Sequence, residues 1–440
     1  MSEAEIPKRR RCDVVALGNQ PLETPSASEV ESIRRLLGWG GTDVYMIGSE
    51  EVEAVRRVIE SGQLLRYRGG EGGETDKFEA EWSAKIGVKH SLAVTSGTAA
   101  LICGLVGMGI GPGDEVIVPG YTFMATPVAV LAVGAVPIIA EIEESLGLDA
   151  ADVERKITPR TKAIIPVHMC GFPANMDAIM AVANKHGIKV LEDACQADGG
   201  SYHGKRLGSI GHAGAFSFNH FKIITCGEGG AVTTNDDAIF YGALVHHDSG
   251  CVFRDHAADV TVPFFTGWNF RINEILSAIL RVQLTRLDGI LARLRAEKKL
   301  MMQELAGCSA FRFNPINCAE GDCATTLGLF FESAQEAAAF ASRANEIGVS
   351  CGSPYHSGIH VYWNWEPILK QSGAHHPMRD AYKLTDVKYE YSEDMCPKTK
   401  EYLARTIYLS MSVSRSKDDL MDVISRVKQA ASTMPARASV

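Results

Sequence analysis

The chain has 440 residues, of which 46% are hydrophobic and 22% are charged, with a formal net charge of −9. This composition is typical of a globular protein with a sizeable core, and the acidic balance argues against a nucleic-acid-binding surface. No secretory signal pattern follows Met1, and no apolar run of about 18 residues suggests a membrane span. The 11 cysteines form no CxxC pair, which favours reduced thiols and a cytoplasmic protein. We expect no metal, membrane or nucleic-acid partner.

The first half of the chain is predicted to alternate strands with helices. Residues 1–45 are expected to be an N-terminal extension with one helix near 28–37. Helices are then predicted at 50–61, 78–86, 97–110, 124–134 and 176–186, and strands at 91–96, 114–120, 135–142, 161–169, 188–194, 213–218 and 229–235. This alternation predicts a mainly parallel sheet that is covered by helices on both faces.

The second half begins with a long apolar-periodic helix at 271–305, of the kind that joins a large domain to a small one. Further segments are then predicted as a strand at 325–333 and helices at 334–347, 398–406 and 416–432. We therefore expect an N-terminal extension (1–45), a large domain (46–288) and a small C-terminal α/β domain (289–440).

Two segments contain the candidate catalytic residues. Lys222 follows an apolar strand-like run and precedes the glycine turn at 227–230; a lysine there is either a surface charge or an amine that forms a Schiff base with a carbonyl. Asp193 lies just beyond a buried strand, where an open α/β sheet presents its ligand groups. Pyridoxal phosphate (PLP) needs both, because its aldehyde takes a lysine and its pyridinium nitrogen a carboxylate. The sequence therefore predicts a PLP site.

The phosphate of such a cofactor needs backbone N–H donors. The segment 96–101 (SGTAAL) ends a strand and opens a helix, so its free N–H groups and the positive helix end favour an anion. The stretch 68–74 (RGGEGGE) is a weaker candidate, because no strand leads into it and no Lys-Ser or Lys-Thr pair closes a nucleotide-binding loop. We interpret it as a mobile flap at the active site.

Seven blocks in order along the chain resemble the DegT/DnrJ/StrS family of sugar aminotransferases, which are PLP enzymes of fold type I. They are LAVTSGTAAL, GIGPGDEVIVPGYTF, AVGAVPI, ITPRTKAIIPVHMCG, LEDACQADGG, FSFNHFKIITCGEGGAVTTND and GWNFRINEILSAI. The resemblance implies a large domain with a mainly parallel seven-stranded sheet between helices, plus a smaller C-terminal α/β domain. LRYRGG, AEIEESLGL, VHMCG and Asn364-Trp365 most resemble the 8-amino-3,8-dideoxy-manno-octulosonate transaminase branch.

The resemblance also implies roles for individual residues and a homodimer with shared active sites. Lys222 matches the Schiff-base lysine, Asp193 the carboxylate on the pyridinium nitrogen, and Gln196 the neighbour of the 3-hydroxyl. The other matches are phosphate contacts from the backbone of Thr98 and Ala99 and from the hydroxyl of Ser217, an aromatic cover from Phe123, and a phosphate contact in the neighbouring subunit from Asn269. Glutamate or glutamine is the implied amino donor.

The implied acceptor is a small polar ketone with an anionic group, such as a keto-sugar acid, used in specialised-metabolite or surface-sugar biosynthesis. Basic and aromatic residues that suit such a ligand are Arg66, Tyr67, Arg68, His356, His360 and Trp365. Two features depart from the family pattern. Residues 354–365 (PYHSGIHVYWNW) occupy the place of the usual Tyr-x-Pro-x-His motif. Glu141 occupies a position where an aspartate is usual. We expect both in the acceptor pocket.

Two alternatives remain open from the sequence. A sugar dehydratase of the same fold carries histidine in place of the cofactor lysine; Lys222 argues against it, although His220 lies two residues away. A PLP-binding regulator without turnover would not need the intact set of Asp193, Ser217 and Lys222. The histidine-rich segment 246–256 is interpreted as a loop rather than a metal site.

Overall fold

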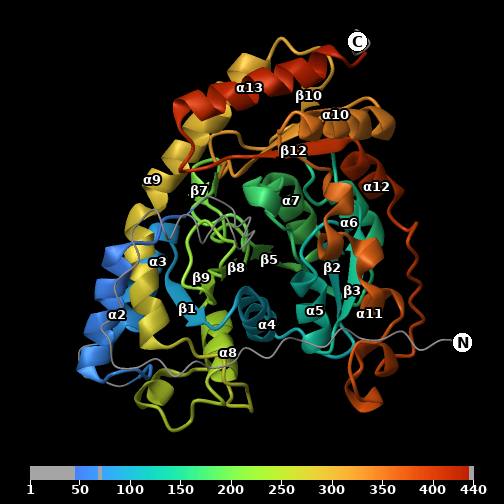
Figure 1. Ribbon diagram of the computed structural model, residues 1–440. Helices are drawn as coiled ribbons and strands as arrows, with labels where there is room; N and C mark the ends of the chain where they lie inside the picture. Colours follow the sequence, from blue (N-terminus) through green and yellow to red (C-terminus); the bar gives the residue numbers. More distant parts are fainter. Residues whose placement is uncertain (1–44, 68–71, 436–440) are drawn as a thin grey trace, which may run out of the picture. The chain divides into compact units, whose positions relative to one another are not determined.

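The structure, a computed structural model, describes residues 45–67 and 72–435 (Figure 1). The chain divides into two units, Met1–Gly41 and Thr42–Val440, and every described residue belongs to the second. The helix expected near 28–37 and the residues 68–71 of the glycine-rich stretch lie outside the described residues. In the part of the chain that is described, no helix has the length and apolar character needed to cross a membrane.

A seven-stranded sheet in the order β1-β9-β8-β5-β4-β2-β3 organises the larger part of this unit. The strands are β1 (His90–Val94), β2 (Glu115–Pro119), β3 (Val136–Ala140), β4 (Thr161–Ile164), β5 (Lys189–Asp193), β8 (Ala213–Ser217) and β9 (Gly230–Thr234). Strands β3, β2, β4, β5 and β8 pair in parallel, whereas β9 is antiparallel to both β8 and β1. The prediction of a mainly parallel seven-stranded sheet is confirmed.

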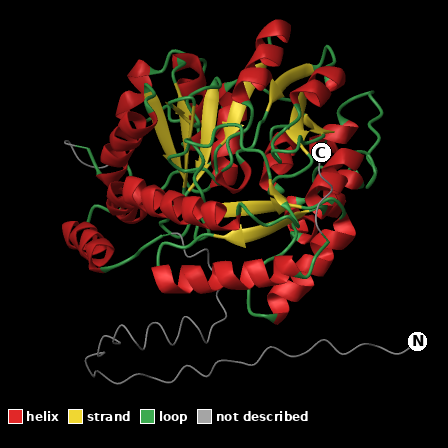
Figure 2. Cartoon of the chain, turned by 90° about the horizontal axis from the view of Figure 1, so that it is seen from above, coloured by secondary structure: helices red, strands yellow, loops and turns green. Residues whose placement is uncertain are grey.

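Alternate residues of each strand belong to different cores, which is why these strands read as continuous apolar runs. In β2, Val116 and Val118 pack in one core and Ile117 in the other. One core contains helices α4 (Gly97–Gly107), α5 (Ala125–Ala132) and α8 (Asp237–His247); the other contains α3 (Glu74–Ile86), α7 (Met176–His186) and α9 (Glu274–Leu305). Figure 2 shows helices on both sides of the strands.

The long helix α9 begins at the N-cap Asn273, whose side chain accepts a hydrogen bond from the Leu276 N–H. It contacts α2 (Ser49–Ser61) and α3 near one end and α13 (Lys417–Ser432) near the other, as Figure 1 shows. Beyond it lies a three-stranded antiparallel sheet of β10 (Arg312–Phe313), β11 (Thr326–Phe330) and β12 (Thr406–Ser410), with α10 (Ala334–Glu346). The domain boundary that we predict at residue 288 falls inside α9. This boundary stays a prediction.

The remaining elements are short. They are α6 (Ala150–Lys156), β6 (Ser201–Tyr202), β7 (Lys205–Arg206), α11 (Glu366–Leu369), α12 (Pro397–Ala404) and the 3-10 turns Met169–Gly171, Asp255–Asp259, Pro354–His356, Gly358–His360, Tyr362–Asn364, Pro377–Arg379 and Ala381–Lys383.

Helix α8 was not predicted from the sequence, and its burial explains why. The consecutive residues Gly242–His247 are all buried, so the helix has no apolar stripe for a periodicity argument to detect. Its start does carry a local signal, because the Asp236 side chain caps the N–H groups of Ala238 and Ile239.

Candidate active site

The carboxyl ends of strands β5, β8 and β1 meet at one edge of the large sheet. In the parallel pair β5–β8, Asp193 lies beside Ala215, so Asp193 and Ser217 end up at the same edge. Gly97, just after β1, closes the group: a Cβ on Gly97 would lie 2.7 Å from Cβ of Ser217 and 2.9 Å from Sγ of Cys195. Glycine is therefore required where the three strand ends converge.

Asp193 is buried, and both of its carboxylate oxygens accept hydrogen bonds. Thr126, in the first turn of α5, donates to Oδ2 over 2.7 Å, and the Cys195 N–H donates to Oδ1 over 3.1 Å. The Thr126 hydroxyl is itself 2.7 Å from that of Thr122. These contacts hold the carboxylate in one orientation. Sequence reasoning missed Thr126, since nothing in its own segment indicates a partner on β5.

Lys222 lies on the connection 218–229 between β8 and β9 and is half-buried. Its backbone N–H donates to the Asn219 carbonyl over 3.0 Å, which makes a tight turn. The positive charge of its side chain lowers the pKa of the Cys170 and Cys195 thiols, the Asp198 carboxyl and the His360 imidazole, although burial has the larger effect on each. The Lys222 side chain is therefore near the turn that follows β5.

Phe123 and His360 come together beside this cluster. Their ring centroids are 5.4 Å apart, and the Thr122 N–H donates to the His360 carbonyl over 2.9 Å. Burial lowers the pKa of the His360 imidazole, and the nearby Lys222 charge lowers it further. The Nδ1 of His360 lies 3.0 Å from the Ser357 carbonyl, so Nδ1 carries the proton and Nε2 keeps a lone pair.

Gln196 and the start of α4 lie at the same edge. The Gln196 Oε1 accepts a 3.0 Å hydrogen bond from the Cys170 N–H. At the start of α4, the Ser96 hydroxyl accepts from the Ala99 N–H over 3.1 Å. The N–H of Ala99 is thus used by the helix cap, and among the described residues the N–H groups of Gly97 and Thr98 keep no acceptor. The expected phosphate contacts of Thr98 and Ala99 stay a prediction.

The structure gives Arg66 and Trp365 positions that do not suit substrate contacts. Arg66 is buried, donates to the Ala93 carbonyl over 2.9 Å and pairs with Glu79 at 2.5 Å. Trp365 is also buried, and its Nε1 donates to the Ile359 carbonyl over 2.8 Å. The polar groups of both side chains are therefore bound to other parts of the protein. Arg68 lies outside the described residues.

Tyr67 and His356 remain near the surface of the unit. Tyr67 adopts a left-handed φ of 67°, and its hydroxyl is 3.2 Å from Nε2 of His247. Its ring is covered by the Arg254 guanidinium at 5.1 Å. His356 is exposed, with its ring edge toward Tyr355 at 5.1 Å.

Asn269 is exposed on the loop that follows α8, next to the exposed Trp268. Its Oδ1 accepts a 3.3 Å hydrogen bond from the Arg271 N–H, and its backbone bridges to Asp248. This position leaves its amide nitrogen available at the surface, and its expected contact with a neighbouring subunit stays a prediction.

His220 is turned toward Tyr45, whose hydroxyl lies 2.8 Å from the His220 Nδ1. A dehydratase of this fold would carry histidine at position 222. Position 222 is a lysine, and the nearby His220 contacts Tyr45 instead.

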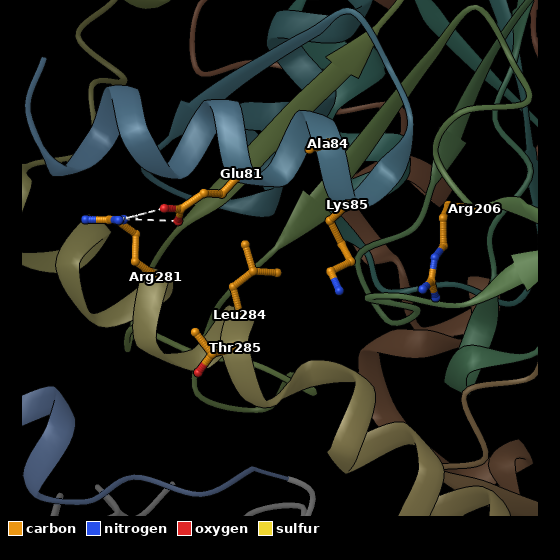
Figure 3. Close-up of a pocket in the computed structure, with 7 residues that line it drawn as sticks. All are labelled: Glu81, Ala84, Lys85, Arg206, Arg281, Leu284 and Thr285. Carbon is orange, nitrogen blue, oxygen red and sulfur yellow. Dashed lines mark hydrogen bonds and ion pairs between the residues drawn. The ribbon is translucent and has the colours of Figure 1, made fainter.

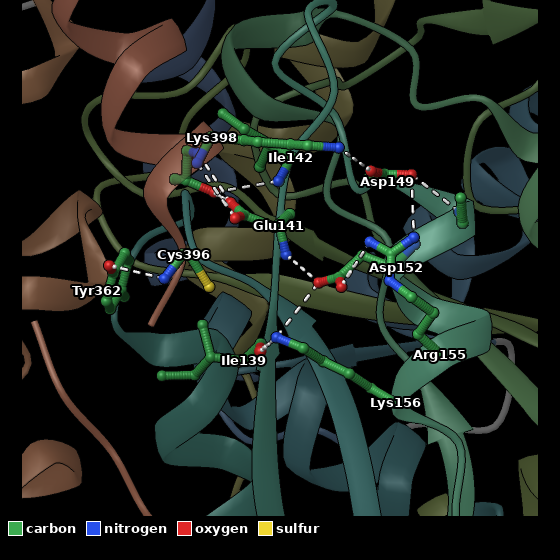
Figure 4. Close-up of polar contacts among 12 residues, drawn as sticks. Ile139, Glu141, Ile142, Asp149, Asp152, Arg155, Lys156, Tyr362, Cys396 and Lys398 are labelled. Carbon is green, nitrogen blue, oxygen red and sulfur yellow. Dashed lines mark hydrogen bonds and ion pairs between the residues drawn. The ribbon is translucent and has the colours of Figure 1, made fainter. Parts of the chain in front are cut away.

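Glu141 does not belong to the acceptor pocket, which corrects our expectation. Its carboxylate accepts the N–H groups of Lys398 (3.1 Å) and Thr399 (2.8 Å) and the Thr399 hydroxyl (2.6 Å), as Figure 4 shows for Lys398. These are the first-turn donors of α12, which a carboxylate stabilises. Glu141 thus anchors α12 at the end of β3.

An open groove of about 590 Å³ lies between α3 and α9, away from these residues (Figure 3). Its lining includes Glu81, Lys85, Arg206 and Arg281, and the cations are already paired: Arg281 with Glu81, and Lys85 and Arg206 with Asp288. Because these cations are already in ion pairs, the groove gives no reason to place the catalytic site there.

Comparison with known proteins agrees with this geometry. The DegT/DnrJ/EryC1/StrS aminotransferase family model matches residues 45–428. The spore coat polysaccharide biosynthesis protein SpsC of Bacillus subtilis (strain 168) is 34% identical over 398 residues, which cover 87% of this chain and 95% of that protein. GDP-perosamine synthase of Caulobacter vibrioides is 45% identical over 217 residues, or 49% of this chain and 57% of that protein. The solved structure of S. venezuelae DesV in complex with a ketimine intermediate matches with a TM-score of 0.72 at 29% identity, over 93% of this chain and 98% of that one.

The residues present fit PLP, because a buried carboxylate, a half-buried lysine and free N–H groups at a helix start lie at one sheet edge. The fold and this site define a PLP-dependent aminotransferase of fold type I. The chain belongs to the DegT/DnrJ/EryC1/StrS aminotransferase family.

Proposed function

We propose that this aminotransferase uses Lys222 as its cofactor lysine and transfers an amino group from glutamate or glutamine to a keto-sugar or a related small polar ketone. The observation that carries the proposal is the pairing of β5 with β8, which brings Asp193 and the Lys222 connection to one edge. PLP, when bound, supplies an electron sink for the bond-breaking step.

The roles that we propose for the individual residues are those implied by the family resemblance. Asp193, held by Thr126 and the Cys195 N–H, would hold the ring nitrogen of bound PLP. Gln196 would lie beside the 3-hydroxyl of the cofactor, and Ser217 would contact its phosphate. Lys222 would accept the proton from the substrate Cα and release it again later in the reaction, for which a neutral amine is needed.

The acceptor pocket is proposed to lie between Phe123 and the segment 354–360. Phe123 is 42% exposed although it lies at the site, so its ring face is available to a ligand. His360 offers the lone pair of Nε2 to a substrate hydroxyl. We retain Tyr67 and His356 as candidates at the rim, and no longer include Arg66 or Trp365.

The sugar character of the acceptor is supported by the relatives, since the matched proteins include a spore coat polysaccharide biosynthesis protein and GDP-perosamine synthase. The specific acceptor that the sequence motifs favour is an eight-carbon octulosonate, which would be aminated at C8. A cytoplasmic protein serving surface-sugar or specialised-metabolite biosynthesis is the corresponding cellular role.

A homodimer with shared sites is proposed from the surface around Asn269. Large apolar side chains are exposed on the loop that carries it: Val252, Phe253, Phe264, Phe265 and Trp268. An apolar patch of this kind next to a residue assigned to a second site is typical of an interface. A second copy of the chain is therefore the partner that we expect to cover it.

Borohydride reduction of the holoenzyme tests the central assignment. Mass spectrometry of the digested protein should find the cofactor-derived mass on the peptide that contains Lys222. Lys222→Ala should lose the visible absorbance and both half-reactions, whereas Lys162→Ala, which removes an exposed lysine, should retain them. Full turnover in Lys222→Ala would refute the assignment.

Subunit mixing tests the shared site. Lys222→Ala and Asn269→Ala homodimers should each be impaired, whereas a mixture should regain activity, because one hybrid site has both residues intact. A mixture no more active than its components would place Asn269 outside the partner's site. A panel of keto-sugars offered to the pyridoxamine form identifies the acceptor.

A further inference from the structure

The side-chain amide of Gln196 has a defined orientation. Its Oε1 accepts the Cys170 N–H over 3.0 Å. Because only the oxygen of an amide accepts a hydrogen bond, this contact decides which branch of the amide is the oxygen and leaves Nε2 as a donor on the other branch. Gln196 is half-buried, and its Nε2 has no hydrogen-bond partner among the described residues. A donor is therefore left for a ligand at the carboxyl edge of the sheet.

The backbone of Cys170 has an unusual conformation in the turn Met169–Gly171. Its φ is 54° and its ψ is 24°, in the left-handed region that is unfavourable for a residue with a Cβ atom. Such a conformation persists only where the surrounding structure holds it. The Cys170 carbonyl accepts the Thr325 hydroxyl over 2.7 Å, and the Gly171 carbonyl accepts the Cys323 N–H over 3.1 Å. The segment that precedes β11 therefore holds this turn.

These contacts form a continuous path from the segment before β11 to Gln196. Thr325 is itself fixed, because its carbonyl accepts the Met411 N–H over 2.9 Å. Its hydroxyl binds the carbonyl of Cys170, and the N–H of Cys170 binds Gln196. Both groups that Cys170 contributes belong to its backbone. A change in the Cys170 backbone conformation would therefore disturb both hydrogen bonds together.

We propose that Thr325 is a positioning residue that acts through the Cys170 backbone to direct the Gln196 NH₂ group toward the 3-hydroxyl of the cofactor. The proposal rests on the proposed role of Gln196 in cofactor binding. Because the NH₂ group can only donate, the cofactor oxygen is the acceptor in this contact, and an oxygen with negative charge suits it best. Thr325 thus determines which side of the amide faces the ligand, without contacting the ligand itself.

Titration calorimetry of the full-length protein, freed of cofactor, tests the proposal without measuring turnover. The two ligands are pyridoxamine 5′-phosphate and its 3-deoxy analogue, which lacks the hydroxyl. Neither ligand bonds covalently to a lysine, so the result does not depend on Lys222. Thr325→Val removes the hydroxyl and nearly keeps the shape. The Kd of pyridoxamine 5′-phosphate should rise about threefold to tenfold, whereas the Kd of the 3-deoxy analogue should stay unchanged.

Two control variants accompany this measurement. Thr325→Ser keeps the hydroxyl and should bind both ligands as the wild type does. Thr285→Val makes the same change at an exposed residue of α9 (Figure 3) and should leave both Kd values unchanged. Thr325→Ala gives the same readout if Thr325→Val does not fold, as judged by circular dichroism. Equal weakening of both ligands, or no weakening of either, would overturn the proposal.

A Gln196 variant separates this inference from the proposed function. Gln196→Leu should raise the Kd of pyridoxamine 5′-phosphate but not that of the analogue, and adding Thr325→Val should cause no further rise. If Gln196→Leu did not discriminate between the two ligands, the proposed role of Gln196 would be refuted, and with it the purpose of the path. If Gln196→Leu discriminated and Thr325→Val did not, the role of Thr325 alone would be refuted.

Discussion

The hydroxyl of Thr126 donates a 2.7 Å hydrogen bond to Oδ2 of Asp193, and so couples the first turn of α5 to the end of β5. Asp193→Asn removes the charge but nearly keeps the shape. We expect turnover to fall by about 10²-fold or more, because a fixed charge of this kind contributes about 3 kcal/mol to the transition state. Stopped-flow measurement of the donor half-reaction checks this.

Thr126→Val serves as the graded companion of that variant. It removes one hydrogen bond to the carboxylate and leaves the charge, so a loss of about tenfold is expected. If Asp193→Asn lost less than threefold, another residue would have to hold the ring nitrogen.

The second prediction concerns Glu192, which faces away from Asp193 on β5. The His168 Nδ1 accepts the Ala174 N–H over 3.1 Å, so the proton lies on Nε2, which donates to Glu192 over 3.1 Å. Backbone N–H groups between residues 208 and 211 donate to the same carboxylate at 2.6–2.9 Å. Glu192→Gln would place an NH₂ group among donors, and the free energy of unfolding should fall by about 3 kcal/mol.

Urea unfolding followed by circular dichroism measures this effect. Glu154→Gln is the control: Glu154 is an exposed residue bound to Lys185, and the variant should leave the midpoint unchanged. Equal midpoints for both variants would mean that the buried network contributes nothing.

The third prediction separates stability from selectivity at Glu141. Glu141→Gln keeps the size of the side chain but weakens the capping of the N–H groups of Lys398 and Thr399, so the free energy of unfolding should fall by about 1–2 kcal/mol. The KM for the acceptor should stay unchanged, because the side chain ends at α12. A selective rise in that KM would return Glu141 to the acceptor pocket.

The fourth prediction is a pH dependence. Burial raises the pKa of Asp198 in the folded protein well above its unfolded value, so the folded state holds the proton more tightly. Between these two values the folded state binds more protons, and its stability falls as the pH rises. Asp198→Asn lacks this loss. The difference in unfolding free energy, variant minus wild type, should therefore increase from about pH 5 to about pH 8. A constant difference would contradict the raised pKa.

Local sequence patterns were sufficient for much of the fold and for the centre of the site. Alternating apolar runs predicted the sheet, and the position of Asp193 after a strand predicted its place at the carboxyl edge. The aminotransferase class and the PLP cofactor are confirmed by the family match and the solved relatives. The individual roles of the site residues, the shared site and the acceptor stay predictions.

The sequence did not predict contacts between distant segments, because no local pattern encodes them. Thr126 lies 67 positions before Asp193, and Glu141 lies 258 positions before Thr399. From the sequence, Arg66 is interpreted as a charge on a loop. Its ion pair with Glu79 on α3 becomes visible only in the structure. The missing partners of Asp198 become visible only when its whole surroundings are known.

The connection that carries Lys222 is tied at both ends, since Ser217 and Gly230 face each other in β8 and β9. The segment around His360 belongs instead to a succession of short turns held against Phe123. For enzyme engineering this separates two tasks. With the acceptor pocket that we propose, residues 354–360 are the segment to vary for new ketones, and the connection that carries Lys222 is left unchanged.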